Sequence, residues 1–185
     1  SMGTPTGERV MMRIDPKKPI LKTLTDLGMR EKMQEQVKGM LNAEKSLAIV
    51  SGPPGHGLPT TWRVALESAD RFVRDFHAFE DKSTAEPEMI NITQHLFDGQ
   101  AGESPMTLLP SLLLKQPDVL VFPEFVNEET VKTVCEEVLE ESRHAIVKVV
   151  AATAVEALIK LAVTYKNQAK QLLKIANGVC NQRLM

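Results

Sequence analysis

The sequence predicts an α/β fold in which a mostly parallel sheet is covered by helices on both faces. Three short and almost wholly apolar runs, at residues 47–50, 119–122 and 145–150, have the composition of strands buried on both sides. Each run is followed by a segment in which apolar residues recur at helical spacing. Buried strands that alternate with amphipathic helices are typical of parallel sheets joined by right-handed crossovers.

The composition is that of an ordinary globular domain. With 185 residues, of which 43% are hydrophobic and 25% charged, the chain is long enough for one α/β domain and a short arm. The net charge of -2 gives no electrostatic reason to expect nucleic acid or an anionic membrane as a partner. Cys135 and Cys180 fit no zinc-binding spacing, so we expect two reduced thiols and no metal site. The most apolar stretch, residues 145–163, is interrupted by charges and therefore predicts a strand and a helix rather than a membrane span.

The first 24 residues are expected to form an arm, and residues 25–185 the folded domain. Within the arm, residues 8–14 alternate in polarity as a strand does. Pro16 and Pro19 would end that strand, because proline cannot donate a backbone hydrogen bond to a neighbouring strand.

The same periodicities predict the elements between the three apolar runs. A helix is expected at residues 29–42, where apolar residues gather on one face, and another at residues 59–70. Residues 106–115 are expected to form a helix or a helix broken at Pro110. Further strands are expected at residues 72–79 and 89–94, the second of them near an edge of the sheet.

Helix-capping residues mark the remaining helices. Asn127 is expected to cap the helix that follows the second apolar run, and Thr153 has the capping-box spacing with Glu156. The last helix is predicted at residues 166–177, with Gly178 as its stop.

A glycine-rich loop joins the first buried strand to the helix that follows it. Gly52 and Gly57 have the separation found in the phosphate-binding motif GxxxxGK[ST] and the right place between strand and helix. Glycines there let backbone N–H groups converge on an anion at the helix N-terminus. The candidate phosphate-binding residues are Gly52, Pro53, Pro54, Gly55, His56, Gly57, Leu58, Pro59, Thr60 and Thr61.

The loop lacks the two side chains that phosphate chemistry uses. Leu58 stands where the motif has its lysine, and Pro59 stands where a hydroxyl would bind magnesium. Losing one well-placed electrostatic group commonly costs on the order of 10² to 10³ in rate, so we expect no ordinary ATP turnover. A register shift onto Thr60 or Thr61 would restore a metal ligand but no cation, and His56 is expected to be an exposed loop histidine.

Several segments in sequence order resemble the nucleotide-binding domain of the type II secretion and type IV pilus assembly ATPases. Residues 7–10 and 24–29 are similar to the lead-in before that family's phosphate loop. Residues 114–120 with Pro123 and Glu124 resemble its Walker B region, and residues 181–184 resemble its Gln-Arg-Leu segment. The resemblance covers residues 7–184.

The resemblance implies a RecA-like P-loop fold, ATP and magnesium as ligands, and a hexameric ring. It also implies a cytoplasmic position against inner-membrane secretion or pilus proteins. Two catalytic acids are implied as well: Glu80, which with Asp81 matches the acidic box, and Glu124, which matches the Walker B glutamate. Without the resemblance, Glu80 and Asp81 are better explained as two solvated acids after a strand.

Several departures from the family pattern concern catalysis. Besides Leu58 and Pro59, the glycine expected before Glu124 is Pro123, and the histidine box reads as residues 150–154 without a histidine. Nucleotide binding is therefore expected to be weak or absent.

Three functions stay open on the sequence. The first is a degenerate domain that does not hydrolyse ATP and serves a secretion or pilus machine as a scaffold or regulatory subunit. The second is a working or slow ATPase whose cation comes from another segment or subunit. The third is a domain that binds nucleotide through backbone N–H groups and does not hydrolyse it.

Overall fold

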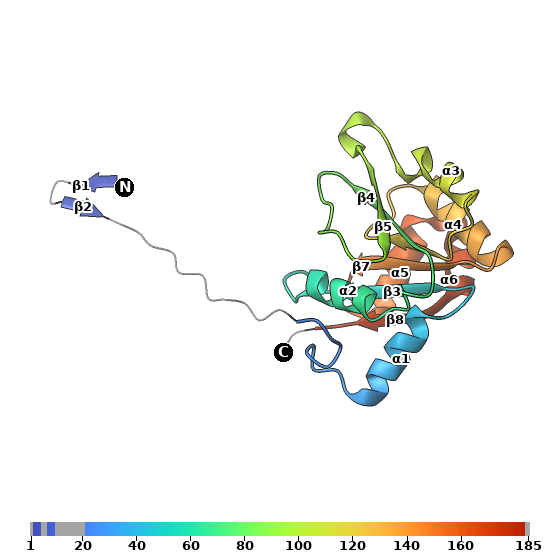
Figure 1. The fold of residues 1–185 in the computed structure, drawn as a ribbon, viewed down its shortest axis with the longest axis horizontal. Helices are drawn as coiled ribbons and strands as arrows, with labels where there is room; N and C mark the ends of the chain where they lie inside the picture. The colour runs from blue at the N-terminus through green and yellow to red at the C-terminus, as the bar shows by residue number, and fades with distance from the viewer. Residues whose placement is uncertain (1, 5–6, 10–20, 184–185) are drawn as a thin grey trace.

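The domain is built on one sheet of six parallel strands in the order β5–β4–β6–β7–β3–β8 (Figure 1). This computed structural model describes residues 2–4, 7–9 and 21–183. The strands are β3 (Leu47–Gly52), β4 (Phe76–Asp81), β5 (Ile92–Phe97), β6 (Val119–Phe122), β7 (His144–Val150) and β8 (Ala176–Asn181). Because all six strands are parallel, their carboxyl ends meet at one edge of the sheet.

Helices cover both faces of this sheet, as predicted. Apolar side chains of α1 (Glu31–Leu41) and α2 (Leu58–Glu67) share one core cluster with the strands. The other face is covered by α3 (Leu109–Leu113), α4 (Glu128–Glu140), α5 (Ala154–Thr164) and α6 (Ala169–Ile175). Short 3₁₀ turns at Gly99–Ala101, Pro105–Thr107 and Lys166–Gln168 complete the connections.

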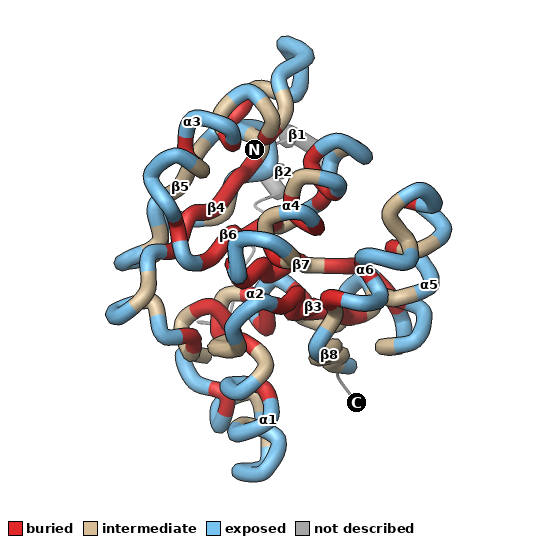
Figure 2. Tube along the Cα trace, turned by 90° about the vertical axis from the view of Figure 1, so that its right-hand side faces the viewer, coloured by how far each residue is buried: buried red, intermediate tan, exposed pale blue. Residues whose placement is uncertain are grey.

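Side chains of successive residues in the central strands lie alternately in the two cores, because they point to opposite faces of the sheet. In β3, Leu47 and Ile49 lie in the core with α4 to α6, whereas Ala48 and Val50 lie in the core with α1 and α2. Figure 2 shows the buried trace following β6, β7 and β3 through the middle of the molecule.

The arm contains a short antiparallel pair, β1 (Met2–Thr4) and β2 (Gly7–Arg9). The strand predicted over residues 8–14 overlaps β2 at its first residues only; the rest of it, with Pro16 and Pro19, lies outside the described residues. Leu24, which the sequence assigned to the arm, is buried in the core beside α1 and α2.

The C-terminal end of the domain differs from the prediction. The helix predicted over 166–177 is present as a 3₁₀ turn and α6, but it ends at Ile175. The chain then forms β8, which pairs with β3, so the predicted stop at Gly178 is wrong. Gly178 instead lies within β8, where a Cβ would come within 2.9 Å of the Met40 sulfur. The signal was weak because this strand contains Asn and Gly residues and is only partly buried.

Two other strands begin later than predicted. β4 begins at Phe76 instead of residue 72, and Phe72 and Val73 are left exposed. β5 begins at Ile92 instead of residue 89, after Asn91 in a left-handed conformation with φ of 59°. The helix predicted over 106–115 is a 3₁₀ turn followed by the short α3.

The predicted caps are confirmed. The Asn127 side chain accepts a hydrogen bond from the Thr130 N–H at 2.8 Å, and the Thr153 hydroxyl accepts one from the Glu156 N–H at 3.1 Å. The Glu156 carboxylate accepts the N–H of Ala152 rather than that of Thr153, so the second half of the capping box is shifted by one residue.

Candidate functional site

The glycine-rich loop has the backbone path expected of a phosphate loop. It leaves β3 at Gly52, and Gly55 and Gly57 both have φ near +76° to +79°, a conformation that favours glycine. Gly57 is the N-cap of α2, and Pro59 lies in the first helical turn, where its missing N–H leaves no intrahelical bond unmade.

Leu58 is part of the hydrophobic core. Its side chain is 6% exposed and packs with α1, α2 and the strands they cover. It also lies over the start of the loop, since its Cδ1 is 3.7 Å from where a Cβ on Gly52 would lie. The position that offers a cation in the motif therefore holds a buried apolar side chain close to the first glycine of the loop.

The end of β8 closes the other side of the loop. A Cβ on Gly52 would lie 2.8 Å from the Gln182 carbonyl oxygen, so only glycine allows this close approach. The Gln182 N–H donates to the Ser51 carbonyl at 3.0 Å. The buried Thr61 hydroxyl contacts both the Gln182 Oε1 atom and the Gly57 carbonyl. Thr61 is thus engaged by protein oxygens, whereas Thr60 is exposed.

The two predicted acids meet at the carboxyl ends of β4 and β6. Glu80 and Glu124 line one hollow, together with Asp81. The rest of its lining comes from Phe79, Ser83, Thr84, Phe97, Pro123, Phe125 and Val126. The parallel sheet therefore brings together acids that are 44 positions apart in the chain (124 minus 80).

Glu80 is buried and hydrogen-bonded to the loop that follows its strand. Its Oε2 atom accepts the Glu86 N–H at 2.7 Å, and burial raises the pKa of its carboxyl group above the ordinary value, against that hydrogen bond. Asp81 shows the opposite shift: the Ser83 hydroxyl and N–H hold its pKa below the ordinary value. Asp81 also accepts the Gly99 N–H at 3.1 Å. Both acids therefore fix loops at this edge.

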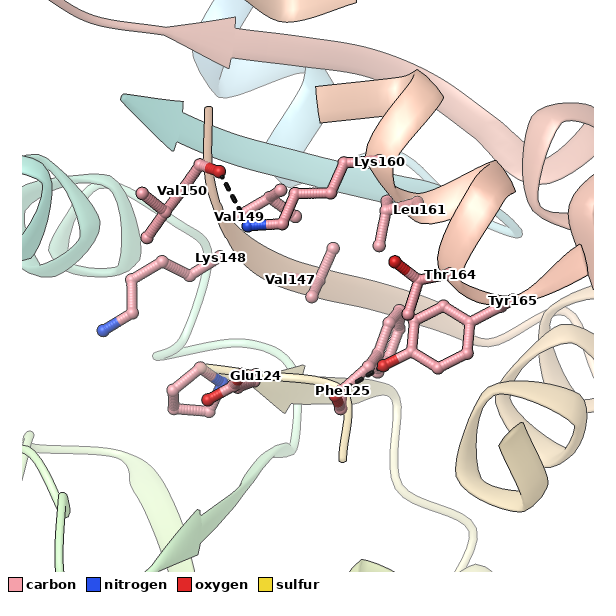
Figure 3. Close-up of a pocket in the computed structure, with 11 residues that line it drawn as sticks. Glu124, Phe125, Val147, Lys148, Val149, Val150, Lys160, Leu161, Thr164 and Tyr165 are labelled. Atoms are coloured by element: carbon pink, nitrogen blue, oxygen red, sulfur yellow. Dashed lines mark hydrogen bonds between the residues drawn. The ribbon is translucent and has the colours of Figure 1, made fainter. Parts of the chain in front are cut away.

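Glu124 is exposed and also borders a second, mostly apolar hollow (Figure 3). The Tyr165 hydroxyl donates to the Phe125 carbonyl at 2.6 Å, and the Lys160 ammonium donates to the Val150 carbonyl at 3.1 Å. Burial, with Glu124 as a smaller cause, raises the pKa of Tyr165. This second hollow includes Val150, the first residue of the segment that stands in place of the histidine box.

Lys148 is a site residue that the sequence reasoning missed. Its ammonium group pairs with the Glu86 carboxylate at 2.7 Å and lies 5.6 Å from the centre of the Trp62 ring on α2. Through Glu86, Lys148 is linked to Glu80. A lysine within an otherwise apolar strand needs a buried partner, and that was the available signal.

Comparison with known protein families identifies the family of this chain. A family model described as "Type II/IV secretion system protein" matches residues 1–185. The chain belongs to this family. The sequence-based assignment to the secretion and pilus ATPases is thereby confirmed.

Curated relatives of this secretion-family domain are several times longer than the chain. It is 32% identical over 124 residues to type II secretion system protein E of Klebsiella pneumoniae, an alignment that covers 67% of this chain and 24% of that protein. It is 26% identical over 189 residues to the type IV pilus assembly ATPase PilB of Thermus thermophilus, covering 100% of this chain and 20% of PilB. The chain thus spans about a quarter or less of the length of these two relatives.

Solved structures support the RecA-like P-loop fold of this secretion-family domain. The pilus retraction motor PilT with bound ADP matches with a TM-score of 0.63 and 21% identity, over 94% of this chain and 50% of PilT. The VirB11 ATPase of the Brucella suis type IV secretion system, in complex with sulphate, matches with a TM-score of 0.61 and 14% identity, over 85% of this chain and 48% of VirB11. Among the described residues, no helix combines the length and apolar character needed to cross a membrane.

Proposed function

We propose that this domain is a degenerate secretion-family ATPase domain that does not hydrolyse ATP and acts as a scaffold or regulatory subunit of a secretion or pilus-assembly machine. The observation that carries the proposal is the packing of Leu58. An apolar side chain buried against the start of the loop occupies the place of the catalytic cation.

The residues of the loop do not fit magnesium triphosphate. Pro59 has neither a hydroxyl for the metal nor an N–H for a phosphate oxygen. The buried hydroxyl of Thr61, in the first turns of α2, already contacts Gln182 and Gly57. A metal-bound phosphate at this loop would need Thr61 to give up these contacts, and it would still meet no fixed positive charge from Leu58.

The contacts of the three acids at the carboxyl edge of the sheet support the same proposal. Glu80 and Asp81 accept backbone N–H groups of neighbouring loops, so each carboxylate already makes structural bonds. Glu124 is exposed at the rim of two hollows. We assign Glu80 a structural role and Glu124 the position of an inherited acid.

Steady-state ATP turnover of the purified chain tests the proposal. We expect phosphate release with magnesium to equal that of a Glu124→Ala variant, because neither protein has the loop cation. Metal-dependent turnover well above the Glu124→Ala background would refute the proposal.

A gain-of-function variant sharpens that test. Leu58→Lys combined with Pro59→Thr restores both motif side chains, so magnesium-ATP should raise its melting temperature more than that of the wild type. Leu58→Met combined with Pro59→Thr is the matched control, since it restores the hydroxyl without the charge. Equal shifts for the wild type and the Lys variant would show that the cation deficit is not what limits binding.

Lys148 favours a second candidate function, that of a slow ATPase with a relocated cation. It is a cation on the strand next to β3, and its side chain reaches the α2 helix that follows the loop. If it served the nucleotide, the wild type would bind magnesium-ATP in calorimetry and Lys148→Met would not. If neither protein binds magnesium-ATP, the slow ATPase is excluded and the degenerate domain is favoured.

The partners follow from the family, and we propose them on that ground. The domain would join a homo- or hetero-oligomeric ring in the cytoplasm, beside inner-membrane secretion or pilus proteins. Co-purification with an active homologue tests this assembly. If the chain stays monomeric when it is mixed with each such homologue, the proposed ring is contradicted.

A further inference from the structure

Two histidines and an aspartate form a continuous chain of hydrogen bonds on β4 and β5, outside the candidate site. The Asp75 Oδ2 atom lies 2.8 Å from the His77 Nε2 atom, and the His77 Nδ1 atom lies 2.8 Å from the His95 Nε2 atom. The two imidazole rings are stacked with their centroids 5.1 Å apart, and His95 also stacks on Phe79. The sheet therefore holds an acid and two imidazoles in a fixed order.

The carboxylate of Asp75 sets the direction of this chain. An ionised carboxylate only accepts hydrogen bonds, so the Nε2 atom of His77 carries a hydrogen and donates it. In a neutral His77 the Nδ1 atom is then an acceptor, and the hydrogen between the two rings belongs to the Nε2 atom of His95. The lone pair of a neutral His95 therefore lies on its Nδ1 atom.

This Nδ1 atom is accessible to a molecule in solution. It has no hydrogen-bond partner among the described residues, and it is not a buried atom. His95 is partly exposed on the edge strand β5, whereas His77 is 6% exposed and has both ring nitrogens engaged. Of the two histidines, only His95 can therefore meet a reactant.

The surroundings of His95 keep its lone pair free of a proton. Burial, followed by the charges of His77 and Lys115, lowers the pKa of His95 below the ordinary histidine value. The carboxylate of Asp75 opposes this shift as the smallest cause. The ring is therefore mostly neutral at neutral pH, which is its nucleophilic form. The exposed ammonium group of Lys115 adds a positive charge, which favours an anionic reactant over a neutral one.

We propose that His95 is a nucleophilic histidine that accepts a phosphoryl group from a small anionic phosphoryl donor, with His77 as its base and Asp75 as the orienting group. A nucleophile that is hydrogen-bonded to a base, which a third group orients, is the arrangement of activated nucleophiles in enzymes. The site uses no residue of the glycine-rich loop, so it is independent of the proposed function.

The reaction moves one phosphoryl group and one proton. The Nδ1 lone pair of His95 attacks phosphorus, a P–N bond forms, and the bond to the leaving group breaks with its electron pair on the leaving group. The Nε2 proton of His95 passes to the Nδ1 atom of His77. Asp75 stabilises the imidazolium that results, through the hydrogen bond that it already accepts.

Phosphoramidate, a small anionic phosphoryl donor whose leaving group is ammonia, is the probe for this reaction. The full chain should gain one phosphoryl group on His95, at a rate at least about tenfold above that of N-acetylhistidine. Peptide mass spectrometry at neutral pH locates the group, and His95→Asn should abolish it. His56, which is also partly exposed, is the internal comparison and should react more slowly.

Two variants test the chain behind His95. Asp75→Asn should slow labelling about tenfold, because an amide stabilises an imidazolium less than a carboxylate does. The Asp75 side chain is 57% exposed, so this change leaves the core intact. His77→Gln keeps an acceptor for the His95 N–H but supplies no base, and it should slow labelling at least as much.

The pH profile separates activation of His95 from a structural effect. The wild-type rate should reach half its maximum at a lower pH than the rate of N-acetylhistidine, because the pKa of His95 is lowered. In Asp75→Asn the midpoint should fall further, since the carboxylate raises that pKa. A purely structural role for Asp75 would leave the midpoint where it is in the wild type.

Lys115→Met tests the class of donor. It should slow the reaction with phosphoramidate at low salt and leave unchanged the reaction with diethylpyrocarbonate, a neutral acylating reagent. Lys174→Met is the matched control, since Lys174 is an exposed lysine on α6, and both of its rates should equal those of the wild type.

Four results would overturn the proposal. The first is a His95 that reacts no faster than N-acetylhistidine, and the second is modification of His56 before His95. The third is an Asp75→Asn variant with the rate and pH profile of the wild type. The fourth is a His95 that reacts with diethylpyrocarbonate and not with phosphoramidate, which would make it an acyl acceptor.

Discussion

The glycine-rich loop and the acidic edge of Glu80, Asp81 and Glu124 lie at the carboxyl edge of one sheet but differ in their side chains. The loop has Gly55 and Gly57 in left-handed conformations and carries Leu58 where the phosphate-binding motif has a lysine. The acidic edge keeps its carboxylates, and two of the three bind neighbouring backbone N–H groups.

The proposed function explains this difference, because it requires the shape of the loop without the charge. A loop with the right path stabilises phosphate less without a cation, and acids that bind backbone N–H groups also hold the neighbouring loops in place. Motif residues alone are therefore a poor guide to activity, and what each side chain contacts is a better one.

The largest expected effect comes from Trp62, which lies on the helix after the glycine-rich loop and lines a small hollow with Glu80. It is 1% exposed on α2 and lies next to the Lys148 ammonium group. Trp62→Ala should lower the free energy of unfolding by about 3–5 kcal/mol, through lost burial and the cavity left behind. Chemical denaturation measures this, with Trp62→Phe as a control that keeps an aromatic ring. If Trp62→Ala lost less unfolding free energy than Trp62→Phe, α2 would not anchor the two regions.

Leu58 tests whether the loop has become part of the core. Leu58→Ala should cost about 2–3 kcal/mol of unfolding free energy, because this side chain is buried among apolar groups. Leu58→Met should cost less, since it nearly conserves volume. If both variants were as stable as the wild type, Leu58 would be a loop residue without a packing role, and the contrast with the acidic edge would weaken.

Gln182 tests how far β8 holds the loop in place. Gln182→Ala removes the contact to the Thr61 hydroxyl and the bond to the Leu27 carbonyl, at a cost of about 1 kcal/mol. Gln182→Glu keeps an acceptor for Thr61, so it isolates the Leu27 bond. Hydrogen exchange of the residues 55–61 amides should rise in the Ala variant, and unchanged exchange would contradict a role for Gln182 in the loop.

The smallest expected effects separate the two neighbouring acids by their pH dependence. The pKa of Glu80 is raised by burial, so its contribution to stability is present below the ordinary Glu value and is lost as the pH rises through the folded-state value. Glu80→Gln should therefore be more stable than the wild type at neutral pH and no more stable than the wild type in acid.

Asp81 should behave in the opposite way. Its pKa is lowered by Ser83, so its contribution is present above the ordinary Asp value and is lost as the pH falls through the lowered value. Asp81→Asn should lose stability at neutral pH, and the loss should vanish in acid. Urea denaturation over a range of pH measures both variants, and slopes of the same sign would show that the two acids do not differ.

The sequence predicted the central part of the fold because buried strands carry a strong signal. The runs at 47–50, 119–122 and 145–150 all lie within β3, β6 and β7, whose side chains are apolar toward both helical layers. The edge of the sheet carried a weaker signal. β8 was missed because its polar residues and Gly178 are read locally as the end of a helix, whereas pairing with β3 decides its structure.

The places of the candidate residues in the fold could be predicted from the sequence, whereas their contacts could not. The loop residues and both acids lie at the carboxyl edge, as a strand followed by a glycine-rich turn requires. No local pattern shows that Thr61 contacts Gln182 or that Lys148 pairs with Glu86, because those partners are 121 and 62 positions away. Such contacts exist only in the folded chain.

The pairing of β8 with β3 has a consequence for biosynthesis. The strand before the glycine-rich loop, β3, is translated early. Its neighbours β7 and β8 are translated about 100 and 130 residues later (144 minus 47 and 176 minus 47). A ribosome must therefore release nearly the whole domain before the glycine turn acquires its final neighbours. Until then the nascent chain exposes an unpaired apolar strand, which makes this segment a natural target for chaperones that act during translation.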